Sequence, residues 1–520
     1  MTSGQVFNDF IAIGVTVLAL VYIRRSRRLR LPYPPGPHPL PIFGNLFDIP
    51  KESGHIVYAD MSRRYNSDVI HLDTFGTHLV ILNTVEAAIE LLVRRSAINS
   101  DRPTTMMMHN LLDFGNWGVA FIPYGPRLKD SRRLAQSKLN ATATKDYRPV
   151  ESAAARELLK RLVQNPESFM QDIRHMAGKI ILRITYGFDI KPDNDPYVGI
   201  AERALYATAR VVNPGSYLVD SVPILRFIPE WLPGGGFKKD VKEWQVHFDD
   251  MRDKPFELVK KARSRQPVDY QVSSDSIAAT FLDKMDKSTA DPEYMEDIIK
   301  SALGSFYAAG ADTTVSSLGT FVLAMLLYPD VQKKAQAQID QIVGDRLPEF
   351  EDRQFLPYID AIVSETLRWH PVIPQNVPHL AEQDNIYKGY YIPKGSVLVA
   401  NHWAMLNDPE TYPAPTTFNP ERFLDEHGRI NTDVPDPSSI AFGFGRRICP
   451  GRFMVKESMW ITIASILSTF NIVPKVGADG QPIIPHEEFT DGLLSHPKPF
   501  TCNIQARSRE HEALIYSAAV

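Results

Sequence analysis

Cysteine is almost absent from this chain, which has only Cys449 and Cys502 among its 520 residues. Two cysteines cannot build a disulfide framework, so we exclude a small disulfide-stabilised fold, and a reducing compartment suits the bulk of the chain. A strong net charge is also absent, since the formal charge is −4 and 44% of the residues are hydrophobic. The near-neutral balance argues against nucleic acid as a partner, and the hydrophobic content is enough for a large core.

Domain separators are missing as well. No Gly/Ser-rich linker, charge block, internal repeat or low-complexity tract divides the chain, and no flavin or nicotinamide fingerprint is present. We therefore discount the three domains that length alone would suggest. The apolar periodicity from about 150 to 345 is mostly helical, whereas short apolar runs on either side of Gly76 are typical of a β-hairpin. The predicted fold is mainly α, with small β-sheets near the N-terminus and near 385–400.

Residues 10–23 are an apolar run without charge, at the short end of the length needed to cross a bilayer. The positive charge follows the run, in the arginines at 24, 25, 27, 28 and 30. A cleaved signal peptide has the reverse order, and the positive-inside rule keeps the arginines and all that follows cytosolic. We expect residues 1–30 to be a single-pass N-terminal transmembrane helix with a basic flank, in the endoplasmic reticulum. A buried core helix and a cleaved signal are the alternatives.

The remaining boundaries follow from composition. Residues 31–45 hold six prolines, which predict a stiff, extended hinge between the anchor and the catalytic domain. The catalytic domain is expected over 46–506, and the polar residues 507–520 are expected to be a flexible tail. Residues 229–237 predict a loop whose aromatic side chains either dip into a membrane interface or pack in the ordinary way.

The most informative stretch is Phe442–Gly451, with the sequence FGFGRRICPG. Arg446 and Arg447 place positive charge beside Cys449 in the sequence, and positive charge favours the thiolate that a metal ligand must be. A buried structural cysteine in a glycine turn is the alternative. The spacing of Phe, Gly, Arg, Cys and Gly resembles the haem-binding loop of the cytochrome P450 family, in which a Cys thiolate is the axial ligand of the haem iron. The resemblance implies Cys449 as that ligand, with Phe442, Gly443 and Gly451 beside the haem.

A long helix is predicted over Met295–Tyr328, and it contains the hexapeptide AGADTT at 309–314. A buried helix normally avoids aspartate, and Thr313 is placed to hydrogen-bond back to the carbonyl of Ala309. A solvated acid beside a helical threonine pair is the alternative interpretation. The hexapeptide resembles the oxygen-binding groove of the same family. That resemblance implies that Thr313 hydrogen-bonds the reacting oxygen and that Asp312 relays protons.

Two further motifs strengthen the resemblance. Glu365 and Arg368 share a helix face at i and i+3, and Arg422 lies in a later Pro-Glu-Arg-Phe segment. A surface ion pair is the alternative to the buried structural Glu–Arg–Arg network of the family. The resemblance also implies Arg447, Arg132 and His379 as partners of the haem propionates. The chain departs from the family where Leu128 replaces the usual Trp of a Trp-x-x-x-Arg motif.

The resemblance implies a fungal-type microsomal haem-thiolate monooxygenase with a cytochrome P450 fold. It would oxidise a small lipophilic substrate, such as a terpenoid, a polyketide or a foreign aromatic compound, using O2. Electrons from NADPH would arrive through a separate NADPH-cytochrome P450 reductase or cytochrome b5. The alternatives are a haem-thiolate isomerase or dehydratase, and a non-enzymatic haem sensor or carrier. The Asp312–Thr313 pair argues against the isomerase.

Overall fold

The structure, a computed structural model, describes residues 31–212, 216–287, 289 and 291–517. Helices make up most of it and the sheets are small, as the sequence predicts. The predicted anchor, residues 1–30, lies outside these ranges. Within them, one helix is long and apolar enough to cross a membrane, α12 (Pro292–Leu327), but 78% of its apolar window is buried inside the protein.

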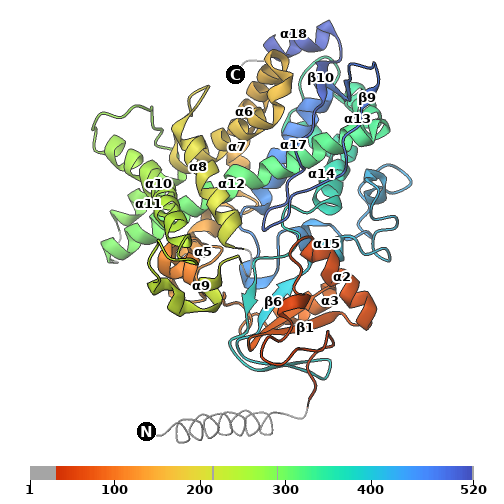
Figure 1. Cartoon of the computed structure of the whole chain (residues 1–520). Coiled ribbons are helices and arrows are strands. Elements are labelled where there is room, and N and C mark those ends of the chain that lie inside the picture. Colours follow the sequence, from red (N-terminus) through yellow and green to blue (C-terminus); the bar gives the residue numbers. More distant parts are fainter. Residues whose placement is uncertain (1–30, 213–215, 288, 290, 518–520) are drawn as a thin grey trace, which may run out of the picture.

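Helix α12 runs through the middle of the molecule, which confirms the long buried helix expected from the sequence (Figure 1). The carboxylate of Asp291 caps it by accepting a hydrogen bond from the Glu293 N–H at 3.1 Å, and the helix ends just before Pro329. Its residues are buried on almost every side because α7, α10, α5 and α17 pack around it. The helix therefore carries its polar residues into the core.

The other helices surround α12 or cover the sheets. Those before it are α2 (Gly54–Tyr65), α3 (Val85–Ala88), α4 (Phe114–Trp117), α5 (Pro126–Lys138), α6 (Arg148–Gln164), α7 (Phe169–Tyr186), α8 (Pro196–Val211), α9 (Leu218–Ser221), α10 (Phe237–Arg263) and α11 (Ile277–Met285). Those after it are α13 (Pro329–Ile342), α14 (Pro357–Trp369), α15 (His402–Leu406), α16 (Ser438–Ala441), α17 (Arg452–Thr469) and α18 (Arg509–Ser517).

The main sheet joins two parts of the chain that the sequence suggested were separate β regions. Its strand order is β1 (Val69–Thr74), β2 (Thr77–Leu82), β6 (Val397–Ala400) and β3 (His379–Leu380). The β1–β2 hairpin turns at Gly76, whose φ of 83° is the left-handed conformation that glycine adopts without strain. Strand β6 lies parallel to β2, with Leu79 opposite Val397. The two-stranded sheets pair β4 (Asn385–Tyr387) with β5 (Tyr390–Ile392), β7 (Phe470–Val473) with β10 (Asn503–Ala506), and β8 (Lys475–Val476) with β9 (Pro482–Ile483).

The prediction of a flexible tail after residue 506 is wrong. Helix α18 forms there and packs against α6 and α17, with the side chain of Ile515 buried. Arg507 secures the entry to this helix through an ion pair with Asp340 and a hydrogen bond to the carbonyl of Ser468 at 3.1 Å. The helix could not be predicted from the polar composition of the segment, because the contacts that hold it are chiefly the buried side chain of Ile515 and the Arg507–Asp340 ion pair.

The proline-rich segment, predicted to be a stiff, extended hinge, makes close contacts with β1. The ring of Tyr33 stacks on that of His71 with centroids 4.8 Å apart, and the carbonyl of Pro35 accepts a hydrogen bond from the His71 N–H at 2.9 Å. At Gly36 an added Cβ would lie 2.0 Å from the carbonyl oxygen of His71. The segment therefore packs against β1, because its prolines leave its carbonyls free to pair and glycine permits close approach.

Candidate active site

The cysteine loop, residues 442–451, lies between α16 and α17, and its backbone closes on itself. The N–H of Cys449 donates to the carbonyl of Phe442 at 2.8 Å, while Gly443 and Gly445 adopt φ values of 75° and 57°. An added Cβ at Gly445 would lie 2.1 Å from the carbonyl oxygen of Leu92. Gly445 therefore presses against a π-helical turn, Ile89–Arg94, and any larger residue there would separate the two segments.

The sulfur of Cys449 lies at the start of α17. The backbone N–H groups of Gly451 and Arg452 point to it, and an added Cβ on Gly451 would be 3.9 Å from Sγ. Burial raises the pKa of the Cys449 thiol, while these N–H groups and the charges of Arg132 and Arg452 act in the opposite direction. Donors already aimed at a buried sulfur favour its binding to a metal ion, which supplies the missing positive charge.

The predicted influence of Arg446 and Arg447 on the sulfur is wrong. Arg447 turns away and donates to the carbonyls of Ser100 at 2.7 Å and Ile122 at 2.8 Å. Arg446 donates instead to the hydroxyl of Tyr124. Side chains on successive residues of a tight turn point in different directions, so neighbours in sequence need not be neighbours in space.

Arg447 belongs to a cluster of basic side chains that we call the cationic cradle, made of Arg102, Arg132 and Arg447 with His379, whose pKa burial holds well below its ordinary value. Arg132 donates to the carbonyl of Ile448 at 2.8 Å, and Nδ1 of His379 lies 2.7 Å from the carbonyl of Asn99. The structure thus brings together Arg132, His379 and Arg447, as the sequence predicts. Arg102 is an addition that no sequence signal suggested.

The positive charge of the cationic cradle is not balanced by carboxylates of the described residues. Among the residues that the structure describes, no carboxylate lies within ion-pair distance of its three guanidinium groups, and the buried Nη1 of Arg447 has no hydrogen-bond partner. Burial and repulsion by Arg132 lower the pKa of Arg447 to about 10, and burial with repulsion by Arg447 and Arg132 lowers that of Arg102. Burial and the charge of Arg452 lower the pKa of Arg132. Because unpaired buried charges are costly, this arrangement favours an anionic group of outside origin.

The sequence predicts a notch in α12 at residues 309–314, and the structure forms the hydrogen bond expected there, from Thr313 to Ala309. Ala309 is the one exposed residue between 298 and 326, and Thr313, one turn later on the same face, donates to its carbonyl at 2.8 Å. At Gly310 an added Cβ would lie 2.7 Å from Cγ1 of Ile181, so its close neighbour is helix α7. Asp312 is paired: its Oδ2 lies 3.1 Å from Nε2 of His496.

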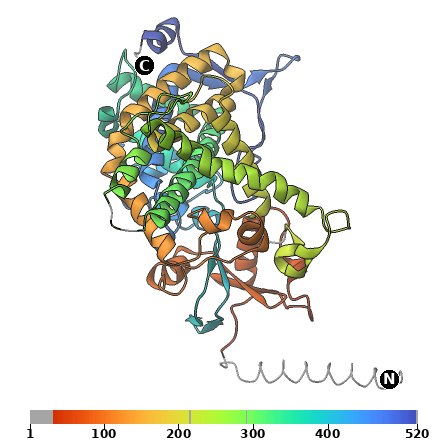
Figure 2. The same cartoon turned by 90° about the vertical axis from the view of Figure 1, so that its left-hand side faces the viewer.

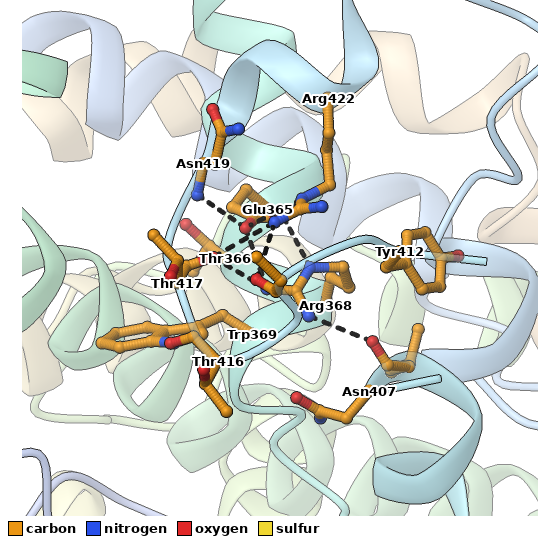
Figure 3. Close-up of polar contacts among 12 residues, drawn as sticks. Glu365, Thr366, Arg368, Trp369, Asn407, Tyr412, Thr416, Thr417, Asn419 and Arg422 are labelled. Carbon is orange, nitrogen blue, oxygen red and sulfur yellow. Dashed lines mark hydrogen bonds and ion pairs between the residues drawn. The ribbon is translucent and has the colours of Figure 1, made fainter. Parts of the chain in front are cut away.

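The Glu–Arg–Arg network is buried and complete (Figure 3). Glu365 receives Nε and Nη2 of Arg368 at 2.7 and 2.9 Å, and its carboxylate lies 3.2 Å from Nε of Arg422. The N–H of Asn419 donates to the same carboxylate at 2.7 Å. Glu365 and Arg368 are wholly buried, so the predicted buried network is confirmed and the surface ion pair is excluded.

The comparisons with known proteins agree with this geometry. The family model described as Cytochrome P450 matches residues 34–504. The chain is 40% identical to cytochrome P450 monooxygenase 98 of Postia placenta over 514 residues, which cover 98% of this chain and 97% of the relative.

The chain is a cytochrome P450.

Two other relatives are similar at almost the same level. Cytochrome P450 monooxygenase ple1 of Rhodocybe pseudopiperita is 39% identical, with 97% of this chain and 95% of the relative covered. Tryptamine 4-monooxygenase of Psilocybe cyanescens is 38% identical, with 94% and 95% covered. The chain is therefore a monooxygenase, an oxidoreductase that uses O2, a substrate and a redox partner, and its family carries a cysteine-ligated haem.

The residues present in this cytochrome P450 suit haem. The two propionates of haem match the need of the cationic cradle for anions, and the donors at the start of α17 match a thiolate ligand. Where the family has Trp, Leu128 is buried and packs with Val119, Ile122 and Tyr124. The hydroxyl of Tyr124 accepts a hydrogen bond from Arg446. The surroundings of Leu128 are therefore mainly apolar, and the one nearby hydroxyl is already paired.

Proposed function

We propose that this cytochrome P450 hydroxylates or otherwise oxidises a small lipophilic molecule with electrons from NADPH. These electrons arrive through NADPH-cytochrome P450 reductase, with cytochrome b5 as an alternative electron donor. The observation that carries the proposal is the cationic cradle beside a cysteine whose sulfur already receives two backbone N–H groups. The absence of any flavin or nicotinamide fingerprint in the sequence supports a separate reductase.

The chain's own residues have distinct tasks in this proposal. Bound haem supplies the iron chemistry that activates O2. Cys449 ligates the iron, with Phe442, Gly443 and Gly451 shaping the space beside the sulfur. Arg132, His379, Arg447 and Arg102 hold the propionates. Thr313 orders a proton at its hydroxyl, and Asp312 supplies it.

The Glu–Arg–Arg network supports the cysteine loop indirectly, through the helices on either side of that loop. Arg368 donates to the carbonyl of Leu406 at 3.1 Å and Arg422 to that of Pro413 at 2.7 Å, so one buried carboxylate organises the segment 406–422. Helix α14, which carries Glu365, packs against α16 and α17, the helices on either side of the cysteine loop. The task of the network is structural, because no member reaches Cys449.

The substrate class is the least defined part of the proposal. Relatives that are called monooxygenases, one of them a tryptamine 4-monooxygenase, support a small organic substrate. We propose that Phe306 and Ala309 form an apolar wall of the substrate space, since Phe306 is apolar and Ala309 carries only a methyl group. An apolar wall favours a lipophilic compound, and we propose a role in secondary metabolism of terpenoids or polyketides, or in xenobiotic oxidation.

We also propose that the enzyme is held at the endoplasmic reticulum membrane by residues 1–30, with the catalytic domain in the cytosol. An exposed apolar surface supports a second contact with the bilayer: Trp231 is 80% and Ile224 70% exposed. Helix α9, just before them in the chain, lies with the main sheet at the lower end of the molecule in both views, where the described chain begins (Figures 1 and 2). Exposed aromatic side chains suit the interface between lipid and water.

The test is co-expression of the full chain with a reductase and a panel of lipophilic compounds, read by mass spectrometry of the products. NADPH consumption coupled to an oxygenated product is expected, and no consumption with any compound would refute the proposed donor or substrate class. Cys449→Ser should abolish the long-wavelength absorption band of the reduced CO complex. Cys502→Ser is the matched control, because Cys502 is buried away from the cradle and burial raises its thiol pKa to about 12.

A further inference from the structure

Asp312, the acid of the α12 notch, has two partners that come from other parts of the fold. Its Oδ2 lies 3.1 Å from Nε2 of His496, and its Oδ1 lies 4.0 Å from Nη2 of Arg174 on α7. Arg174 is shared, since its Nε lies 3.4 Å from Glu202 on α8. Arginine keeps its charge at every pH at which proteins fold, so His496 is the only one of the two partners able to give up a proton.

The backbone around His496 is fixed on both sides. The His496 N–H donates to the hydroxyl of Thr490 at 3.0 Å, and the Thr490 N–H donates to the carbonyl of His496 at 2.8 Å. The preceding residue, Ser495, donates to the carbonyl of Val372 at 2.8 Å and accepts a hydrogen bond from the hydroxyl of Ser316 on α12. This loop therefore holds the imidazole against Asp312.

The ring of His496 also reaches solvent. The side chain is 21% exposed and that of Asp312 18%, and Nδ1 makes no hydrogen bond to any residue within the described ranges. One nitrogen thus faces the acid and the other is left for water. A histidine with this double contact is suited to proton transfer, because its ordinary pKa is near neutrality.

We propose that His496 is the residue through which protons from solvent reach Asp312 during the monooxygenase reaction. A hydronium ion from solvent protonates Nδ1 and leaves water, so the ring becomes an imidazolium; its N–H bond at Nε2 then breaks and an O–H bond forms at Oδ2 of Asp312. The ring ends neutral with its proton on Nδ1, and once Asp312 has passed its proton on, exchange of the ring proton with water returns a proton to Nε2. Asp312 then hands its proton on toward the Thr313 hydroxyl, so His496 acts through Asp312 and does not touch the substrate.

The decisive variant is His496→Gln, whose amide still donates a hydrogen bond to Asp312 but cannot carry a proton. Haem content and the CO spectrum should stay normal. NADPH oxidation should slow about tenfold, less than the ~10²–10⁴-fold of a positioned acid, because water partly replaces a group one step removed. The wild-type rate should fall as pH rises and the ring loses its proton, whereas the variant should lose this inflection.

The chain offers a close control in His370. Its Nε2 lies 2.9 Å from the carboxylate of Glu487 and its side chain is 20% exposed, yet it does not contact Asp312. His370→Gln should therefore keep the wild-type rate and pH profile. Equal slowing in both variants, or an unchanged rate and pH profile in His496→Gln, would overturn the relay.

A second measurement does not depend on turnover. Carbethoxylation of His496 in the full chain is followed site by site with mass spectrometry at one fixed pH. Replacing Asp312 by Asn should speed the labelling, because the ring loses the carboxylate that lies 3.1 Å from Nε2. The other charges nearby, Arg174 with Glu202 and the Lys498–Glu488 pair at 2.9 Å, stay unchanged in this variant.

An unchanged labelling rate in Asp312→Asn would overturn the contact on which the proposal rests. The kinetic arm relies on the proposed use of NADPH, but the labelling arm does not. A wild-type enzyme that oxidises no NADPH would refute the electron donor, and the labelling result would still decide whether His496 and Asp312 are paired.

Discussion

Replacing Arg368 by Met should be among the most damaging changes outside the cysteine loop. Glu365 would lose Nε and Nη2 of Arg368, two of the donors to its carboxylate, and would keep the N–H of Asn419 and the guanidinium of Arg422. The carbonyl of Leu406 would lose a donor at the same time. Removing one partner of a buried ion pair costs about 3–5 kcal/mol.

That cost is large beside a typical unfolding free energy of about 5–15 kcal/mol. Arg422→Met removes the 3.2 Å contact with Glu365 and the donor to the carbonyl of Pro413, but it leaves Glu365 its bidentate partner, so it should cost less, about 1–3 kcal/mol. In the double variant Glu365→Leu with Arg368→Met, no buried carboxylate is left without its partner. This protein should therefore be more stable than Arg368→Met alone.

The assay is urea unfolding of the haem-loaded proteins, followed by haem absorbance and tryptophan fluorescence. Trp369 is a useful reporter, because it is buried beside Arg368 and its Nε1 donates to the carbonyl of Thr416 at 2.9 Å. The control is Arg63→Met, which removes an exposed ion pair with Asp60 at the same i, i+3 spacing and should change stability by less than about 1 kcal/mol. The reasoning fails if Arg368→Met is no worse than Arg422→Met, or if the double variant is the least stable.

Three further outcomes are expected. Leu128→Trp should destabilise the fold by about 1–3 kcal/mol and bind less haem, since Leu128 is 1% exposed among packed apolar neighbours; a higher thermal midpoint would contradict this. Burial raises the pKa of Glu151 from 4.5 to about 8. The folded protein therefore loses stability as pH rises between these two values, because Glu151 must stay neutral in the folded state while it ionises in the unfolded chain. The loss is up to about 1.4 kcal/mol per pH unit. Glu151→Gln should therefore flatten the pH dependence of urea unfolding between about pH 4.5 and pH 8, and equal slopes would refute it. Thr313→Ala should leave haem content normal and release more hydrogen peroxide per product, and unchanged coupling would exclude the notch from the reaction.

Features set by short-range geometry were predictable from the sequence. The Thr313–Ala309 hydrogen bond and the Glu365–Arg368 pair join residues four and three positions apart, and helical spacing alone brings such residues together. The long helix α12 followed from its apolar content and from the Asp291 and Pro329 signals at its ends. For contacts within one helix, the spacing of two residues in the sequence is enough to predict that their side chains or backbones meet.

Contacts between distant segments were not predictable in this way. His496 lies 184 residues from Asp312, and no pattern near either residue names the other. Arg102 was missed because a single arginine in a loop has no signature until the fold places it beside Arg132 and Arg447. The direction of Arg446 and Arg447 was wrong for a related reason, since side-chain orientation in a tight turn depends on which segments pack around it.

The wide spacing of the cationic cradle along the chain has a consequence for how the protein is made. Arg447 donates to the carbonyl of Ser100, 347 residues earlier. At a synthesis rate of about 5–20 residues per second, the ribosome delivers the second of these residues roughly 20–70 s after the first. During that interval Arg102 and Arg132 have no completed site to enter. Haem capture is therefore a late event, and a ribosome that stalls before residue 449 releases a chain that holds most of the cradle but not the cysteine that would bind the iron.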